Sequence, residues 1–170
     1  MAKGNFYTNV IRKAPRYHLP NRNYSLELLE PEFRARIKKF KQFAESQGHK
    51  IVVDETYRSH ARQVHLFKDL KVASKEVGLR SFGLQADFQL YINGVYDPAS
   101  YAYKAFADLA KAAGVLFGLH WVHGVSSENG LYRVDSLQGV PDFRRDELFT
   151  GTWYPPQGYN VYADLRAHGR

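Results

Sequence analysis

Residues 86–92 constrain the fold more than any other segment, because polar and apolar residues alternate strictly along them. This alternation predicts a β-strand with one apolar face and one polar or aromatic face (Phe88, Leu90 and Ile92 against Asp87, Gln89 and Tyr91). Asn93-Gly94 follows directly and is the strongest short hairpin signal in the chain. The segment therefore predicts an antiparallel sheet with one buried side.

Apolar residues at helical spacing predict three helices around this strand: residues 32–46, residues 60–73, and one that Asp97-Pro98 opens and Gly114 ends. Further strands are expected at residues 51–53 and 131–134. A chain of 170 residues, 44% of them hydrophobic, suits a single domain with a real core. Together these patterns indicate an α+β domain with a mainly antiparallel sheet packed with helices.

Composition excludes several classes of protein. The chain has no cysteine, which rules out disulfide scaffolds, thiol catalysis and cysteine-based zinc sites. No apolar run approaches the roughly 18 residues that a membrane span needs, so no membrane partner is expected. The first residues lead into no signal-peptide core, which predicts a protein without a signal peptide.

The two ends of the chain differ from the middle. Residues 1–24 hold five basic residues and no acidic one, and both this segment and residues 146–170 are rich in aromatics and prolines. We interpret them as extended arms that pack on the domain of residues 25–145 or on a neighbouring protein subunit. A solvated tail is the alternative for the first. Because the excess charge lies off the domain, nucleic acid is an improbable partner.

Three stretches, in this order, resemble the zinc-dependent D-alanyl-D-alanine carboxypeptidase and L-alanyl-D-glutamate endopeptidase family, which includes VanY-type enzymes and many phage endolysins. They are Thr56-Tyr57-Arg58-Ser59 with Gln63, then Arg80 to Phe88 on the family's H-x-x-G-x-A-x-D pattern, then Gly118-Leu119-His120-Trp121 with Pro141-Asp142-Phe143. The resemblance covers roughly residues 50–145 and implies the Hedgehog/DD-peptidase fold. It also implies a cleft lined by Arg58, Gln63, Asp87 and Trp121 that could hold a peptidoglycan stem peptide.

The family's catalytic positions are largely substituted here. Its zinc ligands correspond to Arg80, Asp87 and Asp142, its general base to Gly139, and its carbonyl-polarising arginine to Arg58. Arginine has no lone pair to offer a metal, and glycine accepts no proton. The sequence therefore predicts no zinc cofactor and no catalytic residue, with the Arg80 guanidinium bridging Asp87 and Asp142 where the metal would lie.

Two alternatives keep a metal or a base. His120 and His123 could join Asp87 in a new zinc site, or a different alignment across residues 122–138 could supply Glu128 or Asp135 as the base. Either would favour an active cell-wall peptidase with an altered metal site.

The favoured hypothesis is a catalytically inactive, phage-derived peptidase-like protein that acts as a virion-associated, structural or binding component. Its arms would contact protein subunits of an assembly, and it would be found in the host cytoplasm, the virion or both. A third hypothesis is an immunity or inhibitor protein whose basic arm covers an acidic partner.

Overall fold

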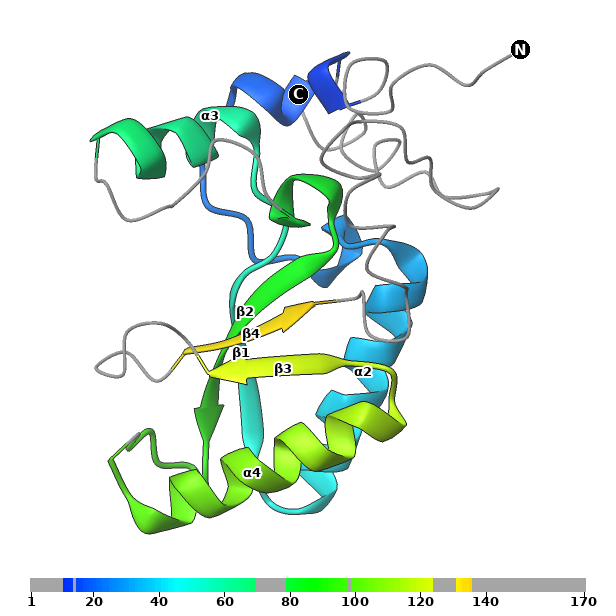
Figure 1. The fold of residues 1–170 in the computed structure, drawn as a ribbon, viewed down its shortest axis with the longest axis vertical. Helices are drawn as coiled ribbons and strands as arrows, with labels where there is room; N and C mark the ends of the chain where they lie inside the picture. The colour runs from blue at the N-terminus through cyan, green and yellow to red at the C-terminus, as the bar shows by residue number, and fades with distance from the viewer. Residues whose placement is uncertain (1–10, 14, 70–78, 98, 124–130, 136–170) are drawn as a thin grey trace.

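The structure is a computed structural model that describes residues 11–13, 15–69, 79–97, 99–123 and 131–135. Its sheet has four antiparallel strands in the order β1-β2-β4-β3 (Figure 1). The strands are β1 (Lys50–Glu55), β2 (Gln85–Tyr91), β3 (His120–His123) and β4 (Leu131–Asp135). Together with the helices, this sheet gives an α+β fold, in agreement with the expectation from the sequence.

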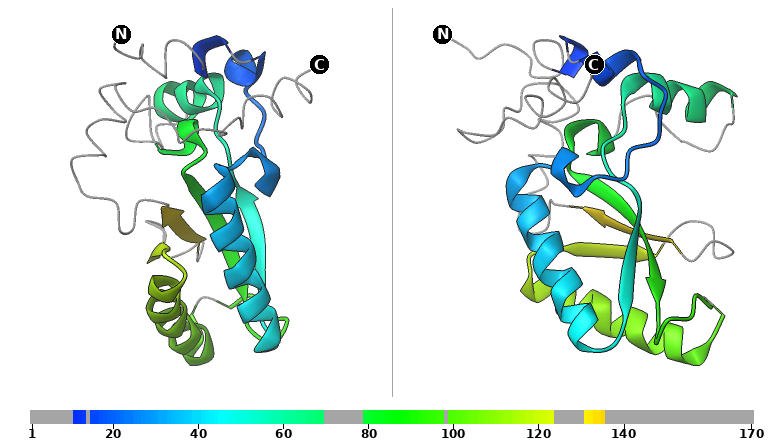
Figure 2. Two further views of the ribbon diagram at one scale, coloured as in Figure 1. Left: turned by 90° about the vertical axis from the view of Figure 1, so that its right-hand side faces the viewer. Right: turned by 180° about the vertical axis from the view of Figure 1, so that it is seen from behind.

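Two long helices enclose the apolar side of the sheet. Helix α2 (Pro31–Ser46) runs beside β1, and helix α4 (Tyr101–Leu116) packs along β3 (Figure 2). Their side chains share one core with the apolar residues of β2, including Phe33, Phe40, Phe88, Leu90 and Phe106. Within the described ranges, no helix has both the length and the apolar character needed to cross a membrane.

Helix α2 begins where the sequence predicts. The Glu30 carboxylate accepts hydrogen bonds from the backbone N–H groups of Glu32 (3.1 Å) and Phe33 (2.7 Å), and Pro31 occupies the first turn. This carboxylate supplies acceptors for N–H groups that have no partner within the helix. Gly48, with φ +80°, follows the helix and lets the chain turn back into β1.

The bounds of α4 differ from the expectation at both ends. The hydroxyl of Ser100 accepts from the N–H of Tyr103 at 3.0 Å, so the helix begins at Tyr101 rather than at Asp97-Pro98. Gly114 lies inside the helix, and the left-handed residue that follows its end is Gly118 (φ +70°). A glycine lacks a Cβ, but it ends a helix only where the backbone adopts this left-handed conformation.

The turn after β2 is the one that the sequence indicates. Asn93 and Gly94 both have positive φ, at 49° and 81°, as a type I′ hairpin turn requires. The returning segment, however, makes only one isolated bridge, between Ile92 and Val95. The expected hairpin is therefore a turn with a very short second arm.

The predicted helix at residues 60–73 is shorter and less regular within the described part. Helix α3 (His60–Val64) is capped by the Ser59 hydroxyl, which accepts from the N–H of Arg62 at 3.1 Å. It continues as a π-helical turn over His65–Asp69. Residues 70–73 lie outside the described residues.

The described part of the N-terminal segment packs on the domain. Residues 15–25 form what we call the N-terminal strap, which begins with the 3-10 turn Pro15–His18. The ring of Tyr17 stacks on His60 with 4.6 Å between centroids, and the Ser59 hydroxyl donates to the Leu19 carbonyl at 2.5 Å. Asn23 Nδ2 donates to the Tyr57 carbonyl at 3.0 Å. Of the three possibilities for this arm, packing on its own domain is therefore the one observed from Tyr17 to Asn23. Residues 1–10 and the expected C-terminal arm at 146–170 lie outside the described residues.

Candidate functional site

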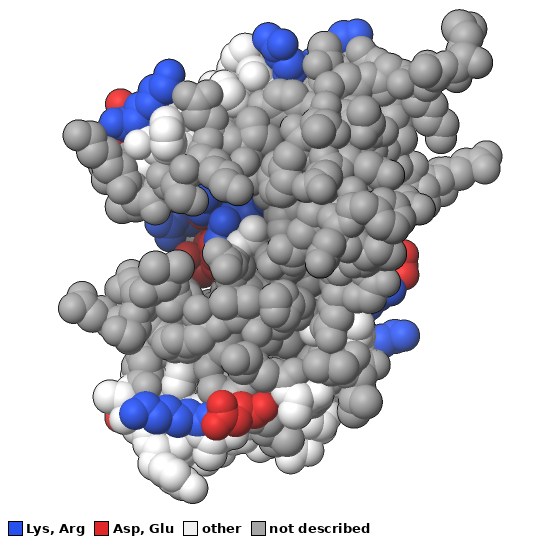
Figure 3. Space-filling view, in the orientation of Figure 1, with Lys and Arg blue, Asp and Glu red and all other residues white. Residues whose placement is uncertain are grey.

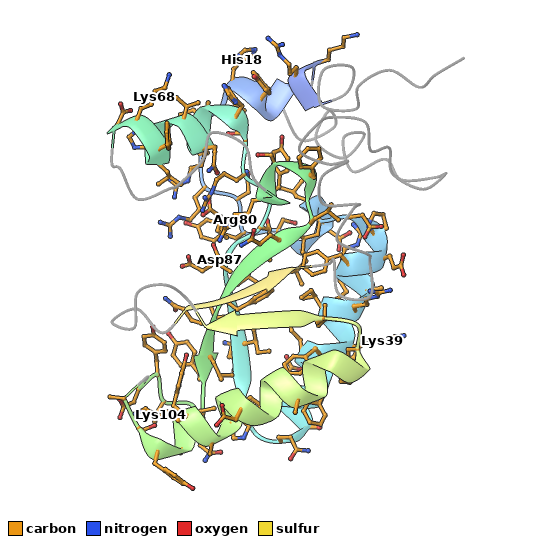
Figure 4. All side chains as sticks on the ribbon, in the orientation of Figure 1. His18, Lys39, Lys68, Arg80, Asp87 and Lys104 are labelled. Atoms are coloured by element: carbon orange, nitrogen blue, oxygen red, sulfur yellow. The ribbon has the colours of Figure 1, made fainter. Side chains whose placement is uncertain are left out.

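Charged side chains gather on the polar side of β2, near the end of β1. Figure 3 shows positive and negative side chains together in a hollow, on the side of the molecule where Figure 4 places Arg80 and Asp87 next to each other. Five residues form this group, which we call the arginine cluster: Glu55, Arg58, Arg62, Arg80 and Asp87. They come from the end of β1, the following segment, α3, the 3-10 turn Leu79–Phe82 and β2.

A β-bulge at the end of β1 brings two carboxylates together. The register shifts between Val53 and Glu55, so that Glu55 lies opposite Asp87 and Asp54 is the extra residue. Glu55 and Asp87 are 3% and 7% exposed, and like charges directly opposite each other in a sheet destabilise it. Guanidinium groups must therefore compensate this pair of carboxylates.

Glu55 is held by two arginines. Arg58 donates to it from Nε at 3.2 Å and from Nη2 at 2.6 Å, and Arg62 Nε donates to Oε1 at 3.0 Å. Arg58 Nη1 also donates to the side-chain carbonyl of Gln63 at 3.1 Å. Burial by itself would raise the pKa of Glu55, but the hydrogen bonds and charges of Arg58 and Arg62 outweigh it and leave the pKa below its usual value.

Asp87 is held by Arg80 in a two-point pair. Arg80 Nε donates to Oδ2 at 3.0 Å and Nη2 donates to Oδ1 at 2.5 Å, while Arg58 Nη2 lies 3.9 Å from Oδ2. Burial is the main cause that lowers the pKa of Arg58; the hydrogen bond to Glu55 opposes this shift, and the charge of Arg80 adds to it. The guanidinium groups are thus close enough to repel each other, and the carboxylates between them stabilise the cluster.

This arrangement does not fit a zinc ion at Asp87, the metal position that the resemblance implies. The Arg80 guanidinium engages both oxygens of Asp87, and a permanent cation at a ligand position repels a dication. Among the described residues, no group of three or more histidine, aspartate or glutamate side chains has a metal-binding arrangement. The expected pairing of Arg80 with Asp87 is present; Asp142, its other expected partner, and Gly139 lie outside the described residues.

The strand register places the backbone of β3 on β4. His120 pairs with Asp135, but His123 is three residues further along the strand and pairs with Tyr132. The side chains of His120 and His123 lie outside the described part of the structure, so a zinc site that uses both histidines with Asp87 stays a prediction. Trp121 was expected in the cleft beside Asp87. Its backbone pairs with Val134, which pairs with Ala86, but its side chain lies outside the described part of the structure, so its place in the cleft stays a prediction.

The structure therefore brings together the predicted residues Arg58, Gln63, Arg80 and Asp87. It adds Glu55 and Arg62, which were not predicted from the sequence. A signal for both exists in the sequence, since Glu55, Arg58 and Arg62 recur at intervals of three and four residues. The bulge makes this signal hard to use, because regular alternation would place Asp54 rather than Glu55 opposite Asp87.

No protein-family model matches the chain, and the search of curated proteins found no match either. The resemblance to the zinc peptidases therefore depends on the quoted residues and their order alone.

Proposed function

We propose that this chain is a zinc-free protein of the Hedgehog/DD-peptidase fold that binds peptidoglycan-type peptides without cleaving them. The observation that carries the proposal is the two-point ion pair between Arg80 and Asp87, which occupies the one carboxylate that remains of the family's ligand set. A bidentate guanidinium–carboxylate pair is among the strongest charge-assisted hydrogen bonds. Zinc would have to displace it without gaining a second ligand from Arg80.

The remaining cluster suits binding better than hydrolysis. Arg58, the position of the family's carbonyl-polarising arginine, is fixed by Glu55 and Gln63, and its side chain is 10% exposed. Guanidinium groups donate hydrogen bonds to peptide carbonyls and carboxylates, but they neither activate water nor accept its proton.

A phage-derived structural or virion-associated role is the wider setting that we propose. Its support is the resemblance to phage endolysins together with the strap, which uses aromatic and polar side chains for packing. In this role, further terminal residues would contact protein subunits of an assembly.

The test measures metal content and catalysis together. The purified protein is expected to contain far less than one zinc per chain and to release no amines from purified peptidoglycan. One zinc per chain, with chelator-sensitive amine release, would refute the proposal and support an active peptidase.

A rescue variant tests the inherited position of the metal. Arg80→His, Asp142→His and Gly139→Glu, combined, restore the family's ligands and base. This triple variant is expected to take up zinc, whereas a control carrying Arg36→His, on α2 outside the cluster, is expected to take up none. Failure of a folded triple variant to bind zinc would contradict the alignment on which the proposal depends.

A further inference from the structure

Arg62 has unused hydrogen-bond donors within the arginine cluster. Its Nε donates to Glu55, and its Nη1 and Nη2 groups have no partner among the described residues. The side chain is only 13% exposed, so most of it is shielded from water. A guanidinium group in that position gains more from an anionic partner than one on the open surface.

The charges of the cluster leave room for one anion. Arg58, Arg62 and Arg80 contribute +3, and Glu55 and Asp87 contribute −2, which gives +3 − 2 = +1 for the described cluster. The neighbouring pair of Arg22 and Asp54, at 3.6 Å, adds no net charge. A single negative charge would therefore complete the cluster.

We propose that the arginine cluster binds the terminal carboxylate of a peptide, with Arg62 as the principal donor and Arg58 beside it. The planar guanidinium fork matches a carboxylate through two parallel hydrogen bonds. A carboxylate also carries one negative charge, as the cluster requires, whereas a phosphate group carries about −1.5 to −2 at neutral pH. The inference deepens the proposed function and depends on it only for the peptide class of the ligand.

The polar side of β2 provides a surface for the rest of such a ligand. Beyond Asp87 it continues with Gln89 and Tyr91, which are both half-buried, and Tyr91 packs against Tyr96 with 5.3 Å between ring centroids. An amide and a phenol pair offer hydrogen bonds and apolar contact to a peptide backbone. The carboxylate end would thus lie at the cluster and the chain would extend along β2.

Isothermal titration calorimetry at low ionic strength tests the proposal with three probes: acetyl-D-alanyl-D-alanine, the same peptide with an amidated C-terminus, and inorganic phosphate. The acid is expected to bind at least about tenfold more tightly than the amide, because only the acid carries the charge that Arg62 pairs with. Arg62→Gln is expected to weaken binding of the acid by about tenfold. Arg34→Gln, which also removes an arginine from an ion pair but on α2, is expected to leave the affinity unchanged.

Four outcomes would overturn the inference: no binding of the acid at millimolar concentration, equal affinity for acid and amide, an unchanged affinity in Arg62→Gln, or binding of phosphate alone. Circular dichroism checks that each variant is folded. If Arg62→Gln unfolds, Arg62→Lys keeps the charge and loses the fork, and it is expected to bind the acid several-fold more weakly than the wild type. A zinc-free protein that fails these tests would contradict this inference, whereas zinc-dependent turnover would contradict the proposed function.

Discussion

Glu55→Gln is the substitution that tests the physical account of the cluster most directly. It keeps the size of the side chain and one oxygen acceptor, and it removes the negative charge that Arg58 and Arg62 share. The new amide group would have to face a guanidinium group, and a donor cannot pair with a donor. Two largely buried cations would then lose their common partner.

The structure allows the cost to be estimated. Glu55 accepts three charge-assisted hydrogen bonds, at 2.6, 3.0 and 3.2 Å, and its side chain is 4% exposed. Removing one partner of a buried ion pair costs about 3–5 kcal/mol. For a chain of this length, that corresponds to a decrease of about 6–20 °C in Tm.

Glu27→Gln is the matched control. Glu27 also bridges two basic residues, Arg34 at 3.0 Å and Lys38 at 2.9 Å, but its side chain is 56% exposed. Exposed pairs contribute about 0–1 kcal/mol each, so this variant is expected to lose little stability. Thermal and urea denaturation followed by circular dichroism measures both variants. Equal losses for Glu55→Gln and Glu27→Gln would refute the argument that burial makes the cluster strong.

Two further predictions concern acid and the strap. The pKa of Glu55 is lower in the folded state than its ordinary value of 4.5, so its stabilisation is present above that value and is lost as the pH falls through the folded-state pKa. Burial raises the pKa of Asp54 despite Arg22, so protonation of Asp54 acts in the opposite direction and offsets part of this loss. Urea titrations between about pH 6 and pH 3 are expected to show a steeper acid loss for the wild type than for Glu55→Gln, and equal slopes would contradict the assignment. Asn23→Ala removes the buried bond to the Tyr57 carbonyl and is expected to cost about 1–3 kcal/mol, whereas the exposed Asn21→Ala is expected to be near neutral in the same assay.

The fold could be predicted from the sequence wherever a single local pattern determines the secondary structure. The alternation at residues 86–92 and the Asn93-Gly94 turn predicted β2, its buried face and the positive φ angles that follow. The predicted ends of α4 were wrong. Ser100 and Gly118 cap this helix, and the sequence gives neither of them a stronger capping signal than Asp97-Pro98 or Gly114. Local chemistry fixes that a helix forms, whereas its exact ends depend on which competing cap the tertiary structure favours.

The candidate site could be predicted from the sequence only in part. Pairing of Arg80 with Asp87 could be expected, because the two residue types are complementary and lie seven positions apart around a turn. The role of Glu55 could not, since it depends on a bulge that moves a carboxylate to the other face of β1. The register of β3 on β4 could not be predicted either, because it is set by pairing across the sheet, which no motif within β3 encodes.

The attachment of the strap to the segment from Thr56 to Ser59 has a thermodynamic consequence. Two residues before Arg58, the backbone N–H of Thr56 donates to the Asn23 carbonyl at 2.9 Å, and the Thr56 hydroxyl donates to the Ser25 carbonyl at 2.8 Å. The docked and released forms of the strap must therefore differ in how firmly Arg58 is held. A molecule that binds more tightly when Arg58 is firmly held must therefore also favour the docked strap and slow its proteolysis. By reciprocity, removing the strap lowers the affinity for that molecule by the same coupling free energy.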